Sequence, residues 1–191
     1  PAWATPVSSF VTISDRPDMN NDGGATGVTA HAAWLNGTLV SSGGAPASVY
    51  VVWGQTDGGT NIGAWANTNY FGQHSNACPW PYGFYAGSLA AETSYFYRFY
   101  ATNAFGAGWA APAAGFSTLS DRPDVNNAGG ATGVTANAAW LNGTLVSSGS
   151  APASVYVLWG MTDGGTNLGA WANTNAFGIN SNTCPRSYSA Y

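Results

Sequence analysis

Calcium binding is the first chemistry that the residue types suggest. Asp18, Asn20 and Asp22, with a glycine following, match the opening of a calcium loop, in which alternate oxygen side chains converge on the cation. The twelfth position of that loop normally supplies a carboxylate, but here it is Thr29. A second copy of the segment has Ala128 in place of Asp22. A turn held by an Asn or Asp side chain is therefore favoured, and a calcium site is the weaker interpretation.

The cysteines and their neighbours suggest metal or thiol chemistry only weakly. His74 and Cys78 are four residues apart and both can ligate zinc, but the second copy has Asn180 in place of His74. Cys78 and Cys184 are equivalent positions of a repeat, so a disulfide within one chain would need equivalent points of two domains to lie about 5.5 Å apart. Two unreactive thiols are favoured, and a cross-link between chains is the alternative.

Catalytic chemistry has little support in the sequence. The chain has two His, one Glu and no Lys, and no set of nucleophile, base and orienting residue stands out. We therefore predict neither an enzyme nor a cofactor. The triplets beginning at Asn36 and Asn142 fit the N-glycosylation pattern, but they are interpreted first as strand features.

Charge is sparse and excludes some partners. Charged residues make up 6% of the chain, against about 25% in ordinary soluble domains, and the net charge is −4. Nucleic acid is not expected as a partner, because phosphate binding needs clustered Lys and Arg. The apolar runs are too short for a transmembrane helix. Pro1 opens directly into repeat material without a signal peptide, so we expect a removed leader or a fragment.

These candidate residues belong to a block that occurs twice. Residues 14–79 return as residues 120–185 at an offset of 106, with 11 differences. Residues 1–13 align with residues 107–119 at the same offset, which predicts the terminal strand of a preceding or neighbouring repeat. The predicted domains are therefore that strand at 1–13, a complete repeat at 14–119, and an incomplete repeat at 120–191 that lacks its last strands.

Strand periodicity runs through the complete repeat. Apolar and polar residues alternate with a period of two, and clusters of Gly, Pro, Asn and Asp separate the runs. The predicted strands lie at 33–40, 49–53 and 95–102, with weaker ones at 64–72, 84–89 and 109–119. Because no helical period is present, the sequence predicts an all-β fold of antiparallel β-sandwiches.

The run from Leu89 to Asn103 follows a Trp-Gly strand and the sequence Leu-Asn-Gly-Thr-Leu. In this order the segments resemble fibronectin type III-like domains of bacterial surface proteins. The resemblance implies tandem immunoglobulin-like repeats with a period of 106, and a tyrosine corner at Tyr95. It implies a spacer, adhesive or scaffold role rather than a reaction.

Large apolar side chains alternate onto strand faces that should meet water. The predicted outward residues, candidates for an assembly interface, are Trp34, Val40, Tyr50, Val52, Phe96 and Tyr100 around Arg98, with Trp140 and Tyr156 in the second copy. Isolated domains rarely expose such patches, and sheet proteins usually protect their edges with Lys. We predict that these faces pack against other copies of the chain. The alternatives are cover by loops or glycans, or a strand offset by one residue, which would swap the two faces.

The leading hypothesis is a bacterial extracellular or cell-surface structural protein, a subunit or segment of a filament that binds other copies of itself. In one version, residues 1–13 of one chain complete the open repeat of the next by strand addition. One strand cannot replace all the missing strands. The interpretation that the chain is a segment of a longer repeat protein is therefore favoured over strand addition. The other hypotheses are a carbohydrate-binding or adhesive module using Trp65, Trp80 and Trp109, and a spacer of a larger secreted protein.

Overall fold

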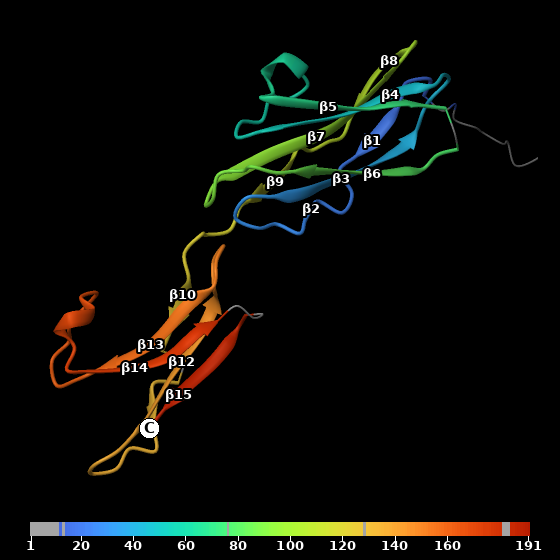
Figure 1. Cartoon of the computed structure of the whole chain (residues 1–191). Helices are drawn as coiled ribbons and strands as arrows, with labels where there is room; N and C mark the ends of the chain where they lie inside the picture. The colour runs from blue at the N-terminus through green and yellow to red at the C-terminus, as the bar shows by residue number, and fades with distance from the viewer. Residues whose placement is uncertain (1–11, 13, 76, 128, 181–183) are drawn as a thin grey trace, which may run out of the picture. The chain divides into compact units, whose positions relative to one another are not determined.

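The computed structural model is all-β and describes residues 12, 14–75, 77–127, 129–180 and 184–191 (Figure 1). The predicted terminal strand at 1–13 lies almost wholly outside the described residues. The chain divides into two compact units: unit 1 comprises Pro1–Val28, Ala32–Leu89 and Thr93–Thr118, and unit 2 comprises Thr29–His31, Ala90–Glu92 and Leu119–Tyr191. Within the described part of the chain, no helix has the length and apolar character needed to cross a membrane.

Unit 1 consists of two antiparallel sheets, drawn as two layers in Figure 1. In the first sheet β3 is central and pairs with all the others; its strands are β1 (Asp18–Asn20), β2 (Ala25–Thr26), β3 (Ala33–Ser41) and β6 (Trp80–Ala86). In the second sheet β4 lies between β5 and β7, and two short strands follow each other along the far edge of β7. Its strands are β4 (Ala47–Gly54), β5 (Asn67–His74), β7 (Ser94–Asn103), β8 (Gly106–Trp109) and β9 (Ala114–Ser117).

The strongest predicted strands are confirmed, and the weaker ones are displaced. The runs at 33–40, 49–53 and 95–102 lie within β3, β4 and β7. The strand predicted at 64–72 begins only at Asn67, because Ile62–Ala64 forms the short 3₁₀ helix η1, whose first turn the Asn61 side chain caps. The strand predicted at 84–89 begins earlier, at Trp80. Its internal proline is tolerated because β6 is an edge strand.

The core of unit 1 lies between the two sheets. Inward residues of β3, β4 and β7 are fully buried there, namely Leu35, Leu39, Val49, Val51, Tyr97, Phe99 and Ala101. Phe99 lies directly over Gly37: a Cβ atom added at Gly37 would be 2.4 Å from Phe99 Cδ2. On its other side Phe99 stacks on Phe71 of β5, with ring centroids 5.8 Å apart. The absence of a side chain at Gly37 is therefore what lets β7 close the sandwich.

Tyr97 ties the two sheets together through a hydrogen bond. Its hydroxyl donates to the backbone oxygen of Asn36 on β3 at 3.0 Å. Burial raises the pKa of Tyr97 to about 12. The protonated phenol is therefore the form that the folded unit favours.

The variant Tyr97→Phe should lose about 1 kcal/mol of stability, because the Asn36 carbonyl loses its donor. The wild-type pKa is higher when folded, about 12, than the ordinary value of 10.0, so this contribution is complete below pH 10. It declines as pH rises from 10 through 12. Thermal unfolding between pH 9 and 12 should show a steeper fall in Tm for the wild type than for Tyr97→Phe. Parallel pH profiles would contradict the assignment.

Asn21 bridges a break at the edge of the second sheet. Along β7, β8 pairs with Tyr100–Asn103 and β9 with Ser94–Tyr97, which leaves Arg98 and Phe99 between them. The Asn21 side chain follows β1 and reaches this gap. Its Oδ1 accepts the Phe99 N–H at 3.1 Å, and its Nδ2 donates to the Pro112 oxygen at 2.7 Å. A side chain of one sheet thus replaces a missing backbone partner in the other.

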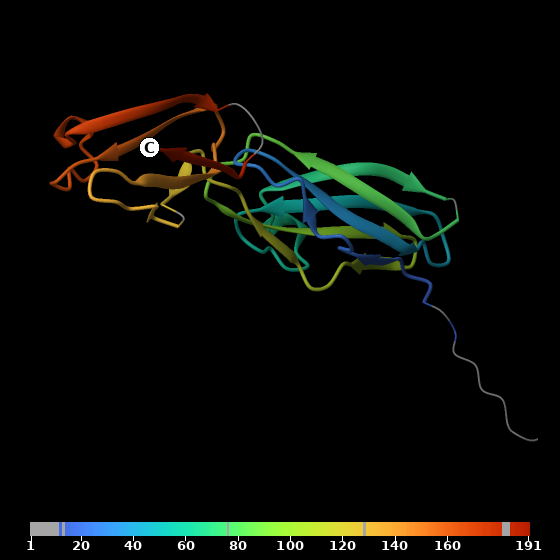
Figure 2. The same ribbon diagram turned by 90° about the horizontal axis from the view of Figure 1, so that it is seen from below.

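Unit 2 repeats part of this arrangement (Figure 2). One sheet contains β10 (Asp124–Asn126), β11 (Ala131–Thr132), β12 (Trp140–Ser147) and β15 (Arg186–Ala190), and the other contains β13 (Ala153–Trp159) and β14 (Asn173–Asn180). The short helix η2 (Leu168–Ala170) corresponds to η1. Among the described residues no strand takes the place that β7 has beside β4. The buried apolar core is accordingly small: Leu145, Ala153 and Val155.

Candidate functional site

Four aromatic side chains lie next to one another across the outer face of the second sheet in unit 1. Tyr50 of β4 is paired in register with Tyr70 of β5 and with Tyr100 of β7, and Tyr100 is paired with Trp109 of β8. The neighbouring ring centroids are 4.7, 5.4 and 4.3 Å apart. We call these four residues the aromatic row.

The alternation of the strands explains why the aromatic row faces away from the core. Val49, Val51, Phe99 and Ala101 point into the core, so Tyr50 and Tyr100 between them point out. Tyr70 is 58% exposed, and the other three rings are half-buried by one another. The row is therefore an apolar surface with polar hydroxyl and indole edges, the kind of surface that tyrosine and tryptophan supply at interfaces.

The structure corrects one member of the predicted interface. Val52 does not belong to the core cluster of unit 1, yet its exposure is 0%. It lies on the central strand β4, opposite Arg98 of β7 and Thr68 of β5, so flanking side chains cover it on both sides. Val52 cannot contact a partner directly. Arg98 itself is half-buried, and its Nε is buried without a hydrogen-bond partner.

A second aromatic feature lies on the outer face of the other sheet. Trp34 of β3 and Tyr85 of β6 are paired in register, with ring centroids 5.4 Å apart, and Trp34 is 46% exposed. Unit 2 has the same pair as Trp140 and Tyr191, at 4.9 Å. Val40 lies on the same strand as Trp34 and is also exposed. The Trp–Tyr pair is thus common to both units.

The aromatic row is not repeated in unit 2. Tyr156, the counterpart of Tyr50, is 51% exposed, but the residue paired with it is Ala176 instead of a tyrosine. The described part of unit 2 also has no strand to supply the counterparts of Tyr100 and Trp109. Phe96 lies beside Arg98 on β7, half-buried. The predicted set thus divides into a row present in unit 1 and a pair present in both units.

The calcium-loop residues form a hydrogen-bonded turn. The backbone N–H of Asp22 donates to Asn20 Oδ1 at 3.1 Å, and the Asn20 side-chain nitrogen donates to the Asp22 carboxylate. Asp18 lies before this turn, at the start of β1. Within the described residues, no three His, Cys, Asp or Glu side chains group closely enough to hold a metal ion. The local geometry is that of the Asn-stabilised turn.

His74 is a buried residue at the end of β5. Its Nδ1 is 3.1 Å from the Tyr82 hydroxyl, and its ring contacts Trp80 with centroids 5.6 Å apart. Burial, and then the nearby Cys78, raise the pKa of the Tyr82 hydroxyl. Cys78 and Cys184 are half-buried and pack against the cores of their own units. A cross-link between chains through these cysteines stays a prediction.

The same position in unit 2 uses different chemistry. Asn180 replaces His74 and is also buried, and Arg186 replaces Trp80. The Arg186 guanidinium donates to Asn180 Oδ1 at 3.1 Å. The two substitutions therefore exchange an aromatic contact for a hydrogen bond between the same two strands.

Trp65 does not form the sugar platform that the sequence suggested. It is 6% exposed, and its Nε1 donates to the Gly59 oxygen at 3.2 Å, which fixes the loop between β4 and β5. Trp80 is 48% exposed on β6, and Trp109 belongs to the aromatic row. Of the three tryptophans predicted for a sugar site, Trp65 is thus wrong as a stacking surface.

Unit 2 contains an open apolar groove where unit 1 has β7. Two hollows, of about 420 and 510 Å³, are both lined by Leu141. Their lining includes Leu141, Gly143, Leu145, Val155, Val157, Trp159, Phe177 and Tyr188. A Cβ atom at Gly143 would meet only the Asn126 oxygen, at 3.1 Å. We call this feature the open groove.

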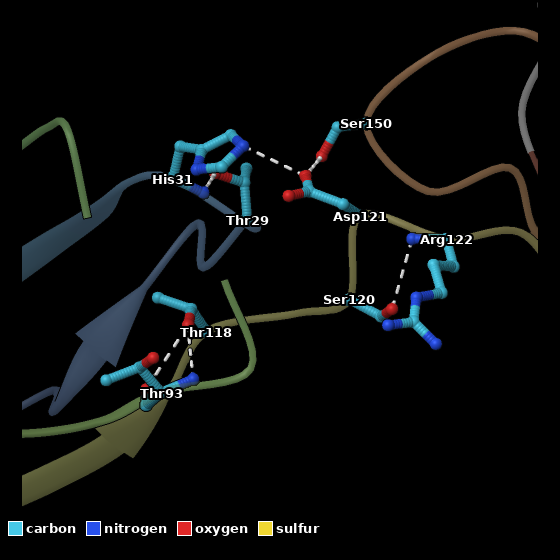
Figure 3. Close-up of polar contacts among 8 residues, drawn as sticks. All are labelled: Thr29, His31, Thr93, Thr118, Ser120, Asp121, Arg122 and Ser150. Carbon is cyan, nitrogen blue, oxygen red and sulfur yellow. Dashed lines mark hydrogen bonds and ion pairs between the residues drawn. The ribbon is translucent and has the colours of Figure 1, made fainter. Parts of the chain in front are cut away.

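Polar contacts cluster around residues 118–122 (Figure 3). In unit 1, Thr118 Oγ1 accepts the Thr93 N–H at 2.9 Å. In unit 2, His31 Nε2 lies 2.9 Å from Asp121, which also accepts from the Ser150 hydroxyl. Both side chains of the ion pair are about half exposed, so its contribution to stability is small.

No protein-family model matches the chain, and no curated protein matches it. Among solved structures, the chain is similar to the sensor domain of the anti-sigma factor RsgI4 from Pseudobacteroides cellulosolvens. The shorter form of that domain is 14% identical with a TM-score of 0.42, over 56% of this chain and 98% of the other. The longer form is 15% identical with a TM-score of 0.37, over 55% and 90%. Likeness at this level carries no inference about function.

Proposed function

We propose that the chain is a bacterial extracellular or cell-surface structural protein, a subunit or segment of a fibre that associates with other copies of itself. Its units would be fibronectin type III-like sandwiches repeated with a period of 106. Two facing antiparallel sheets in unit 1 and the matching strand registers of unit 2 support this finer description of the fold. The proposal includes no catalytic activity and no cofactor.

The aromatic row is the observation that carries this proposal. Buried aromatic side chains each remove about 150–250 Å² from water and dominate the energetics of interfaces. Four adjacent rings on one sheet would form the centre of such a contact. The Trp34–Tyr85 pair on the opposite sheet would supply a second contact, so that one copy can touch two neighbours. With 6% charged residues, little repulsion opposes packing between copies.

Substituting the aromatic row tests the proposal. In the double variant Tyr50→Thr/Tyr100→Thr, the β-branched residues keep the strand propensity but remove both central rings. We expect self-association to weaken by at least roughly tenfold, as for loss of an interface hot spot. Sedimentation velocity and electron microscopy over a concentration series measure the association.

The matched control is Tyr156→Thr, which changes the same repeat position in unit 2, where the row is absent. It should leave association nearly unchanged. Circular dichroism confirms that each variant keeps its β structure. Wild-type chains that stay monomeric at every concentration, or fibres that survive the double variant, would contradict the proposal. Persistent monomers are the outcome that the spacer hypothesis predicts.

A carbohydrate-binding or adhesive module is the second candidate. The aromatic row favours it as well, because exposed rings in line can stack on successive sugar rings. A glycan array with the wild type and the Tyr50→Thr/Tyr100→Thr variant separates the candidates. Glycan binding that the variant loses, in a chain that does not self-associate, would favour the carbohydrate-binding module over the fibre.

A further inference from the structure

We propose that the aromatic row is also an oxidative modification site, at which Tyr50 and Tyr70 of one chain are joined by a carbon–carbon bond into a dityrosine. The co-reactant would be a one-electron oxidant, such as a peroxidase supplied with hydrogen peroxide. The bond would tie the edge strand β5 to the central strand β4. This inference goes beyond the proposed function and does not rest on it, because it requires only one folded copy of the chain.

The sheet holds the two phenols next to each other. Tyr50 and Tyr70 are paired in register, and their ring centroids are 4.7 Å apart, with an angle of 31° between the ring planes. Rings at this separation are in van der Waals contact. Two radicals formed on these rings would meet without diffusing together. Such proximity raises the rate of a reaction within one molecule far above the rate between separate molecules.

Tyr70 has the exposure and the freedom that coupling requires. Its side chain is 58% exposed, and it lies at the end of the row, with Tyr50 as its neighbour. Tyr100 is also close to Tyr50, at 5.4 Å, but it is half-buried and packs against Trp109 on its other side, at 4.3 Å. A ring must turn to form the new bond, and Tyr70 can turn more easily than Tyr100. We therefore assign the bond to Tyr50 and Tyr70.

The fold does not use the hydroxyl groups of these two tyrosines. Tyr50 and Tyr70 lie outside the core cluster of unit 1, and no hydrogen bond among the described residues involves either hydroxyl. Tyr97 differs, because its hydroxyl donates to the Asn36 oxygen of the other sheet. Tyr50 and Tyr70 can therefore each lose the hydroxyl hydrogen without breaking a contact within the sandwich.

The reaction balances with a peroxide as the oxidant. Each phenol loses one electron and one proton, which gives two phenoxyl radicals whose unpaired electrons are shared with the ring carbons next to the hydroxyl group. A bond forms between one such carbon of each ring. Each of these carbons then releases its hydrogen as a proton, each phenolic oxygen gains one, and both rings become aromatic again. In total, two hydrogen atoms leave the protein, and one hydrogen peroxide takes them up to become two waters.

The bond would strengthen a weak point of the second sheet. β5 is an edge strand, and its pairing with β4 shifts register between Val49 and Tyr50. Such irregularities interrupt the backbone hydrogen bonds between two strands. A covalent link between Tyr50 and Tyr70 also closes a loop that the unfolded chain would otherwise leave open. It should therefore raise the Tm of unit 1 by at least about 5 °C.

The second copy provides an internal control for this site. Tyr156, the counterpart of Tyr50, is 51% exposed, and the residue paired with it on β14 is Ala176. Tyr156 is thus an accessible tyrosine on the equivalent strand, with no phenol opposite it. If exposure alone determined coupling, Tyr156 would react as readily as Tyr70.

Oxidation of the dilute full chain with a haem peroxidase and hydrogen peroxide tests this inference. We expect monomers, isolated by size exclusion, whose intact mass has fallen by two hydrogen atoms and which show the blue fluorescence of dityrosine. Peptide mapping of the unfolded product should place the link between Tyr50 and Tyr70. The same treatment in concentrated urea, where the sheet is lost, should give at least roughly tenfold less of the link within monomers.

Phenylalanine variants keep each ring and remove a single hydroxyl group. Tyr50→Phe and Tyr70→Phe should each lower the yield of the link within monomers by at least roughly tenfold, because the remaining tyrosines lack this proximity. Tyr100→Phe and Tyr156→Phe are the matched controls and should give the wild-type yield. Circular dichroism before oxidation confirms that each variant is folded, and thermal unfolding of the linked and unlinked wild type measures the rise in Tm.

Four results would overturn the inference: no link within monomers, a link that maps to other tyrosines, an unchanged yield in Tyr70→Phe, or an equal yield in urea. An unchanged Tm of the linked chain would refute the strengthening of β5. The test is separate from that of the fibre. Coupling in a chain that never self-associates would refute the proposed function but keep the modification site. Fibres that need the aromatic row, formed by a chain that does not couple, would do the reverse.

Discussion

Replacing Gly37 by alanine should lower the free energy of unfolding of unit 1 by about 3 kcal/mol or more, at the upper end of overpacking effects. The added methyl group would lie 2.4 Å from Phe99 Cδ2 and 2.7 Å from the Asn20 oxygen. The ring is packed on Phe71 behind it, and the oxygen belongs to the paired strand β1, so neither can retreat cheaply. Urea denaturation, combined with hydrogen exchange to resolve β3 from β12, measures the loss.

Gly143→Ala is the matched control for this prediction. The same methyl group in unit 2 would meet only the Asn126 oxygen, at 3.1 Å, because no described aromatic ring covers Gly143. We expect a change below about 1 kcal/mol. Equal losses in the two variants would show that the cost arises from the strand backbone and not from the aromatic ring, and would contradict the role assigned to Phe99.

Replacing Asn21 by alanine should cost about 2 kcal/mol, because one side chain satisfies two backbone groups. The Phe99 N–H and the Pro112 oxygen would both lose their partner at the break between β8 and β9. Hydrogen exchange should show selective loss of protection at Phe99, and the unfolding midpoint in urea should fall with an unchanged slope.

Asn127→Ala provides the comparison in the second copy. Asn127 is exposed, and no described residue of unit 2 corresponds to Phe99. Its substitution should change stability by less than about 0.5 kcal/mol. If Asn21→Ala proved equally mild, the break in the second sheet would have to be closed by water instead of by this side chain.

The sequence predicted the central strands well and the peripheral ones poorly, for a physical reason. In β3, β4 and β7 the contrast between core and solvent imposes a period of two that is visible in the residues themselves. The start of β5 depends on the capped turn at Asn61, and the start of β6 on pairing with Leu39. These effects come from a local turn or from tertiary pairing, and the alternation of apolar and polar residues does not reveal them.

The candidate site was predicted in part for the same reason. Alternation gives the direction of a side chain, so Tyr50 and Tyr100 were placed on an outer face, but it does not give the neighbours. Val52 points outward and is nevertheless covered from both sides. Alternation alone does not link Tyr70 to the row, because the pairing of β4 with β5 shifts register between Val49 and Tyr50. The difference between Tyr70 and Ala176 was the one signal of a surface special to unit 1.

The position of Arg98 affects how trypsin can cleave the chain. The chain has four Arg and no Lys, and two of the arginines, Arg16 and Arg122, precede proline, a bond that trypsin cuts poorly. In unit 1 this leaves Arg98, which is half-buried in the middle of β7 and paired with Val52 of β4. Trypsin can reach it only after β7 has left the sandwich. Folded unit 1 is thus shielded from trypsin-like enzymes, and the rate of cutting at Arg98 reports how often the sandwich opens.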